Sequence, residues 1–243
     1  MITIGQVIII LLLSIITIVY TSAGFSGGSA FVAMLLLLGL KPFEASFYGL
    51  LFNAASAAAS LLRWRMHLER SMAWYVVGAV PLAFLGGQLR ISDYWLRIII
   101  SSAIIISGIF IVLTNVRPRR IKESMKVLVG AIIGLLAGIT GIGGGIYLSP
   151  FLFFSGEASP KQIAATTTVF ILLNSSSGLL GKVLASNSPT NLNMLILLML
   201  PFIIFGASIG SFLGSKRLRQ DMLKRLMGML LIVIGVLILV LGT

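Results

Sequence analysis

The stretch GITGIGGG at residues 138–145 interrupts an otherwise apolar part of the chain. Four of the five positions from 141 to 145 are glycine, and each glycine costs a helix about 1 kcal/mol relative to alanine. We therefore expect the helix to break here, between two segments that are short, tilted or re-entrant. A related stretch, GFSGGS at residues 24–29, predicts a second break of the same kind.

The composition around these breaks identifies the solvent of the protein. Of 243 residues, 58% are hydrophobic and only 10% are charged, and the mean hydropathy is +1.10. A soluble domain has about 25% charged residues, so this chain has too few to cover a surface that faces water. The sequence therefore predicts an all-α integral membrane protein of the cell membrane, in contact with the lipid bilayer.

Ten apolar runs are visible along the chain. A helix needs about 20 apolar residues to cross the hydrocarbon core of a bilayer. Six runs meet this length: 45–62, 72–89, 94–113, 163–184, 192–213 and 222–241. The run 4–20 is nearly long enough, whereas 29–40, 127–139 and 146–154 are short and adjoin the glycine stretches.

The sequence also contains an internal repeat. Glycines at 24, 27 and 28 match glycines at 141, 144 and 145 with an offset of 117. Further matches follow in the same order: Pro42 with Pro160, Asn53 with Asn174, Pro81 with Pro201, and Leu96-Arg97 with Leu223-Lys224. Each copy has five apolar runs, and an odd number makes the second copy enter from the opposite face. We predict two inverted-topology repeats, residues 1–116 and 127–243, joined by a basic linker at 117–126.

The basic residues give a separate test of this topology. With both termini outside, 14 of the 18 Lys and Arg residues lie on the cytoplasmic side and four lie outside. That is the positive-inside bias of membrane proteins, so the basic loops are predicted to be cytoplasmic. Lys182 and Arg63 stand near matched positions at segment ends. We expect them to extend to the interface, with a role in an anion vestibule as the alternative.

Several kinds of chemistry have no support in the sequence. The chain has no Cys and one His, His67, which lies in a charged loop. All six acids lie in loops or at segment ends, so paired carboxylates, metal ligands and nucleophile–base pairs are missing from the apolar runs. The net charge of +12 belongs to short loops rather than to a water-facing surface that could bind nucleic acid. We predict no enzyme activity, no catalytic residue, no metal site, no cofactor and no nucleic-acid partner.

The groups available at membrane depth are small and neutral. Glycine breaks free backbone N–H groups, and helix N-termini favour anions. Close helix packing is the alternative role for the glycines, and interhelical hydrogen bonding is the alternative for the asparagines. We predict that a small anion binds at Gly24, Gly27, Gly28, Ser29, Asn53, Gly141, Gly143, Gly144, Gly145, Thr166, Thr167 and Asn174.

The second glycine stretch resembles a known family. GITGIGGGIYLSP at residues 138–150, followed by AATT at 164–167, is similar to the TauE/SafE family of sulfite-exporter-like permeases. The first copy departs from the family pattern: Ser26 and Ser29 replace glycines, and Ala33 stands where a proline is expected. The resemblance implies transport of a small sulfur-containing or organic anion, such as sulfite, thiosulfate or a sulfonate.

These features together predict a secondary transporter for a small anion that works by alternating access. Two alternatives stay open, a passive anion channel and a membrane scaffold that binds a partner protein without transport. The sequence leaves open the substrate, the direction and coupling of transport, and a homo-oligomeric assembly.

Overall fold

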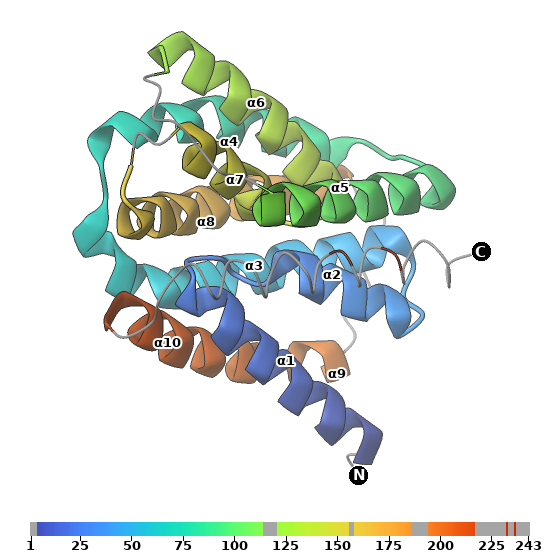
Figure 1. Ribbon diagram of the computed structural model, residues 1–243. Coiled ribbons are helices and arrows are strands. Elements are labelled where there is room, and N and C mark those ends of the chain that lie inside the picture. The colour runs from blue at the N-terminus through green and yellow to red at the C-terminus, as the bar shows by residue number, and fades with distance from the viewer. Residues whose placement is uncertain are drawn as a thin grey trace.

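The computed structural model describes residues 4–113, 121–155, 158–185 and 194–216, together with positions 232 and 236. Within these ranges every regular element is a helix (Figure 1). The α-helices are α1 Ile4–Ser22, α2 Gly28–Leu37, α3 Pro42–Trp64, α4 Ala73–Gln88, α5 Asp93–Leu113, α6 Glu123–Thr140, α7 Gly145–Ser155, α8 Pro160–Ala185, α9 Met194–Leu197 and α10 Leu200–Lys216. Two 3-10 turns, η1 Arg65–His67 and η2 Arg70–Met72, join α3 to α4. The prediction of an all-α fold is confirmed for the described residues.

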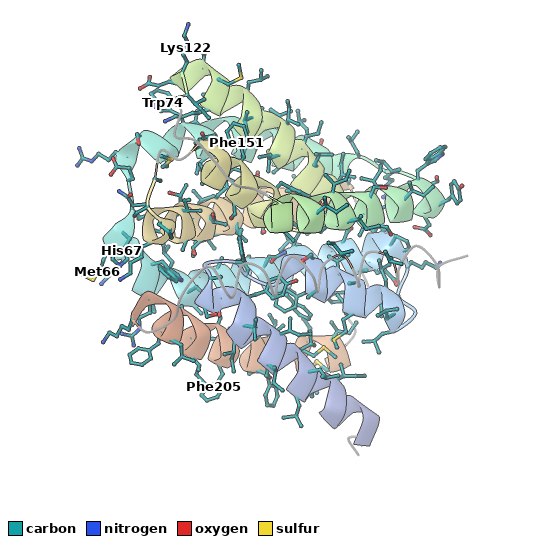
Figure 2. The ribbon with its side chains drawn as sticks, in the orientation of Figure 1. Met66, His67, Trp74, Lys122, Phe151 and Phe205 are labelled. Carbon is teal, nitrogen blue, oxygen red and sulfur yellow. The ribbon has the colours of Figure 1, made fainter. Side chains whose placement is uncertain are left out.

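The outer surface of this bundle is apolar. Among the described helices, α3 with η1, α6 and α8 are long and apolar enough to cross a membrane. Large hydrophobic side chains point outward, including Leu62 at 67% exposure and Phe205 at 65%, the latter labelled on α10 in Figure 2. Such a surface is stable against hydrocarbon and unstable against water, which agrees with a multi-pass membrane protein.

Both predicted helix breaks are present. Residues 23–27 separate α1 from α2, and residues 141–144 separate α6 from α7. The expectation of a short segment at 127–139 was wrong, because α6 has 18 residues and begins at Glu123. Its first turn is polar, and an acidic side chain there is favourable near the positive end of the helix dipole. The hydrophobic run therefore marked only the apolar part of α6, and residues 123–126 of the predicted linker are helical.

The run at 192–213 is divided as well. A turn at residues 198–199 separates α9 from α10, which begins at Leu200, one residue before Pro201. Proline has no N–H to donate, and the N–H groups of the first turn have no acceptor within the helix, so Pro201 suits the first turn of α10. Apart from positions 232 and 236, the predicted run at 222–241 lies outside the described residues, as do residues 117–120 of the predicted linker.

Figure 1 shows the described helices in two groups. One group contains α1, α2, α3, α9 and α10, and the other contains α4, α5, α6, α7 and α8. In the second group α4 packs extensively on α6 and α8, and in the first group α10 packs on α1 and α3. The groups meet where α3 packs against α8.

Glycines let the backbones of the close helix pairs approach each other. On α6 three glycines face α4, where a Cβ would overlap a carbonyl oxygen of the partner helix: Gly130, Gly134 and Gly138. On α10 three glycines face α1: a Cβ would overlap a carbonyl oxygen of α1 at Gly210 and Gly214 and lie 3.0 Å from one at Gly206. A glycine every fourth residue forms one bare stripe along a helix, the pattern that permits close helix pairs in membranes.

Candidate functional site

Helices α3 and α8, which join the two groups, each carry one asparagine near their middle. Asn53 on α3 and Asn174 on α8 are both 0% exposed. Polar amides at such positions are costly unless they are paired. The Asn53 Nδ2 group donates a hydrogen bond of 3.1 Å to the carbonyl oxygen of Gly141, at the end of α6. Asn53 therefore connects the middle of α3 to the second glycine stretch.

The two glycine stretches form loops with left-handed backbone conformations. Gly24 follows the end of α1 with φ +83°, and Gly141 follows the end of α6 with φ +79°. Any other L-residue in this region costs roughly 1–2 kcal/mol. We call residues 23–27 the first loop and residues 141–144 the second loop. Their matched glycines end α1 and α6 in the same way.

Each loop is seated on a helix of the other group. A Cβ on Gly24 would overlap Ala164 of α8, and a Cβ on Gly141 would overlap the backbone of Ser46 of α3. The Thr168 hydroxyl of α8 donates a hydrogen bond of 3.4 Å to the carbonyl oxygen of Gly24. The first loop thus contacts α8, and the second loop contacts α3. Each loop therefore reaches across the interface between the groups, and we call the place where the two loops lie the crossing.

The second loop leaves bare backbone beside polar side chains. A Cβ on Gly143 would stand 2.8 Å from the Ser175 Oγ and 3.0 Å from the Asn53 side chain. A Cβ on Gly144 would stand 3.0 Å from the Asn174 Nδ2. Both asparagines therefore reach the same loop, at consecutive glycines. Side chains at these glycines would displace the amides from the backbone.

Unpaired polar atoms gather at this crossing. Several buried atoms have no hydrogen-bond partner among the described residues: Asn53 Oδ1, Asn174 Oδ1 and Nδ2, Ser175 Oγ and Ser26 Oγ. Leaving such an atom unpaired costs about 1–3 kcal/mol, and native interiors rarely contain several together. A polar ligand bound between the loops would supply the missing partners.

The N-termini of α2 and α7 both lie beside the second loop and the asparagines. Helix α2 begins at Gly28, where a Cβ would overlap the Asn53 amide and the carbonyl oxygen of Ile142. Helix α7 begins at Gly145, directly after the glycine beside Asn174. The first N–H groups of a helix have no acceptor within it and carry partial positive charge. Both helix starts therefore add donors to the site.

The remaining predicted residues lie at the edges of this arrangement. The Ser29 hydroxyl lies 3.4 Å from the hydroxyl of Tyr20, and the Thr167 hydroxyl lies 3.0 Å from that of Ser149. Gly27 is the left-handed residue before α2 and packs on the ring of Phe31, and Gly145 packs on Ile171. Ser29 and Thr167 therefore have local partners, whereas Thr166, at 3% exposure, keeps an unpaired hydroxyl.

Lys182 was expected to extend to the interface, and that expectation was wrong. It lies near the end of α8, yet it is only 1% exposed. Its ammonium group lies 3.5 Å from the carbonyl oxygen of Ile139 and 4.6 Å from the centre of the Phe43 ring. A position near the end of an apolar run suggests the interface, but burial depends on helices from elsewhere in the chain. Arg63, by contrast, is exposed and lies over the Phe212 ring.

The described acids stay away from the site. Glu44, Glu69, Asp93 and Glu123 are all exposed, and the buried charged residues in the described part of the chain are Lys126 and Lys182. The described residues also contain no group of three or more His, Cys, Asp or Glu that could hold a metal ion. The crossing is therefore a neutral, donor-rich site with a cation nearby.

Comparisons with known proteins relate the chain to membrane transporters. The family model described as sulfite exporter TauE/SafE matches residues 9–238. A probable membrane transporter protein, y4hK of Sinorhizobium fredii, is 27% identical over 236 residues, which cover 91% of this chain and 93% of that protein. No solved structure matches the chain.

Proposed function

Because the chain belongs to the sulfite exporter TauE/SafE family and is a membrane transporter, we propose that it carries a small anion by alternating access. The substrate class we propose is a small oxyanion such as sulfite, thiosulfate or a sulfonate. The observation that carries the proposal is the set of unpaired amide and hydroxyl groups at the crossing of the two loops.

The chemistry of the crossing favours an anion. Asn174 and Ser175 offer N–H and O–H donors, and the starts of α2 and α7 add backbone N–H groups and partial positive charge. No described acid is buried, so the described site lacks a negative charge that would repel an anion. Neutral donors bind an anion weakly enough for it to leave again, which a carrier requires.

The contacts between helices support two inverted repeats. If α1 to α5 form one repeat, α6, α7, α8 and α10 match α1, α2, α3 and α4. The fourth helix of each repeat then packs on the first and third helices of the other: α4 on α6 and α8, and α10 on α1 and α3. The loops show the same reciprocal pattern, because each loop rests on the third helix of the other repeat. Two equivalent halves around one site are the usual basis of alternating access.

The burial of both loops favours a carrier over a channel. Residues 24–33 and 138–146 are buried throughout. An open pore would leave some of the site exposed to water. A closed crossing instead suits a state in which the substrate is shielded from both sides, between an inward-facing and an outward-facing state.

We propose that the basic loops lie on the cytoplasmic side and both termini outside. Figure 2 shows Met66, His67 and Lys122 at the same end of the molecule, where α3 ends and α6 begins. The end of α10, which carries Lys216, lies at this end too (Figure 1). This grouping agrees with the positive-inside bias of membrane proteins.

Counterflow in proteoliposomes tests the function. Vesicles are loaded with excess unlabelled sulfite, thiosulfate or a small sulfonate, and uptake of the labelled anion is measured. We expect saturable exchange with at least one anion, lost in Gly144→Val, because Gly144 has φ +84° and its Cβ would approach Phe170 and Asn174. Flux that does not saturate and shows no exchange would contradict a carrier and favour a channel. If correctly inserted protein moves none of the three anions, the proposal that it transports these anions is contradicted.

A further inference from the structure

Lys182 is a buried cation without a described counter-charge. Its side chain is 1% exposed, and no described acid forms an ion pair with it. An ammonium group has three N–H donors. The only described acceptor is the carbonyl oxygen of Ile139, at the limiting distance of 3.5 Å, with the Phe43 ring at 4.6 Å as a further contact. Most of the hydrogen-bonding capacity of Lys182 therefore has no partner among the described residues.

The position of Lys182 connects it to the crossing of the loops. Ser175, Gly178 and Lys182 follow one another at helical spacing along one face of α8. Ser175 borders the second loop at Gly143, and Gly178 packs closely on Gly138 of α6. Lys182 lies seven positions after Ser175 on the helix, about 10 Å along the axis. The carbonyl group that Lys182 contacts belongs to Ile139, two residues before the second loop begins.

Isolated charges within membrane proteins are rare and usually functional, because hydrocarbon and protein interiors solvate them poorly. A lysine that only stabilised the fold would be expected to reach a carboxylate or the interface. Lys182 does neither in the described structure, although it lies in the last turn of α8, where a cation is favoured by the helix dipole.

We propose that Lys182 is the cationic group of the substrate site, and that it receives the charged end of an oxyanion on the side of the loops where α8 ends. This inference rests on the anion-carrier function proposed above. The oxyanion would be the counter-ion that the buried ammonium group lacks. The loops would hold the anion at the crossing, and Lys182 would attract it there from that side.

The matched cation of the other half supplies a control. Arg63 lies near the equivalent position of α3, but it is exposed and rests over the Phe212 ring. It lacks the burial that makes an anion necessary as a partner. Lys182 therefore makes the two sides of the site unequal, and only Lys182 substitutions that remove the charge should weaken anion binding.

Four variants separate the charge of Lys182 from its packing. Lys182→Met removes the charge and the donor, Lys182→Gln removes the charge but keeps an N–H donor for Ile139, and Lys182→Arg keeps the charge. Arg63→Met is the control. Each purified protein is assayed by counterflow with sulfite, thiosulfate and a small sulfonate. The melting temperature is measured in detergent with each anion and without it.

We expect Lys182→Met and Lys182→Gln to raise the KM of exchange about tenfold or more, the loss of one charge-assisted hydrogen bond. The maximal rate should stay within about threefold, and the anion should raise the melting temperature less than in the wild type. Lys182→Arg and Arg63→Met should keep a KM near that of the wild type. Without anion, Lys182→Met should melt no lower than the wild type, because an uncompensated buried charge has been removed.

Other outcomes overturn the inference. If Lys182→Gln keeps the wild-type KM, the lysine acts only as a donor to Ile139. If Lys182→Met melts several degrees lower without anion and its KM is unchanged, the lysine is structural. Both results would leave the carrier function standing. If the wild type exchanges none of the anions and none raises its melting temperature, the carrier function falls, and the role of Lys182 falls with it.

Discussion

The side-chain amide of Asn53 donates a hydrogen bond of 3.1 Å to the carbonyl oxygen of Gly141, 88 residues further along the chain. The bond ties the middle of α3 to the loop that ends α6. It uses only one side of the amide, because the Asn53 Oδ1 has no partner among the described residues. Asn53 thus fixes the second loop and leaves its Oδ1 as a free acceptor in the site. An oxyanion could use this acceptor only through a protonated oxygen or a hydroxyl group of its own.

Replacing the central asparagines should impair exchange. Asn174→Ala removes unpaired donors beside Gly144, and Asn53→Ala also removes the bond to Gly141. We expect Asn174→Ala to lower the exchange rate at limiting substrate about tenfold, the effect of one lost hydrogen bond to a charged group. We expect Asn53→Ala to lower it by a similar factor, because the second loop loses its bond to α3. Counterflow in proteoliposomes measures it.

Ser101→Ala is the matched control for these variants. Ser101 on α5 is also 0% exposed with an unpaired hydroxyl, but it is not one of the groups that border the loops. It should exchange the anion at nearly the wild-type rate. An equal loss in Ser101→Ala would show that buried polar groups act on stability alone.

Two glycines share a left-handed backbone conformation but differ in the space around them, so substituting each tests backbone strain and steric overlap separately. Gly39 has φ +84° with open space around its Cβ position, whereas Gly141 has φ +79° and its Cβ would overlap Ser46. Gly39→Ala should cost about 1 kcal/mol of stability and leave exchange intact. Gly141→Ala should abolish exchange, because the second loop would have to leave α3. Retained exchange in Gly141→Ala would remove the close seating of that loop from the mechanism.

The glycine stripe on α6 should matter for stability. A Cβ at Gly134 would overlap the backbone of Ala79 on α4, whereas a Cβ at Gly178 would have its nearest neighbour 3.2 Å away. Overpacking costs about 1–3 kcal/mol, and alanine recovers about 1 kcal/mol of helix propensity in both variants. Gly134→Ala should therefore melt lower than the wild type in detergent, and Gly178→Ala should melt close to it. The reverse order would show that α4 and α6 adjust freely.

The proposed orientation can be tested by labelling, because the chain has no cysteine. Met66, at 84% exposure, lies in the turn after α3, and Tyr94, at 69%, lies at the start of α5. In intact cells a thiol reagent that cannot cross membranes should label Tyr94→Cys and leave Met66→Cys unlabelled until the cells are opened. The opposite labelling would invert the orientation and place the basic loops outside.

The positions of the helix breaks were predictable from local sequence. Glycine at 24 and 141 permits a left-handed conformation that ends a helix, and this depends on the residue itself rather than on its neighbours in space. The division of the run at 192–213 was not predicted, although α10 begins at Leu200, one residue before Pro201. The start of α6 was predicted wrongly because a polar first turn, with Glu123, does not show in a hydrophobic run although it is a good helix start.

The sequence by itself determined that the protein lies in a membrane, where its helices break, and that neutral donors and glycines recur in two matched sets. Only the tertiary structure decided which helix each loop rests on and which cation is buried. The repeat matches Lys182 approximately with Arg63, but Lys182 is enclosed by Phe43 and Ile139 from distant helices while Arg63 stays exposed. The physical reason is range: helix breaks follow from backbone preferences of single residues, whereas burial and pairing depend on contacts between segments far apart in the chain.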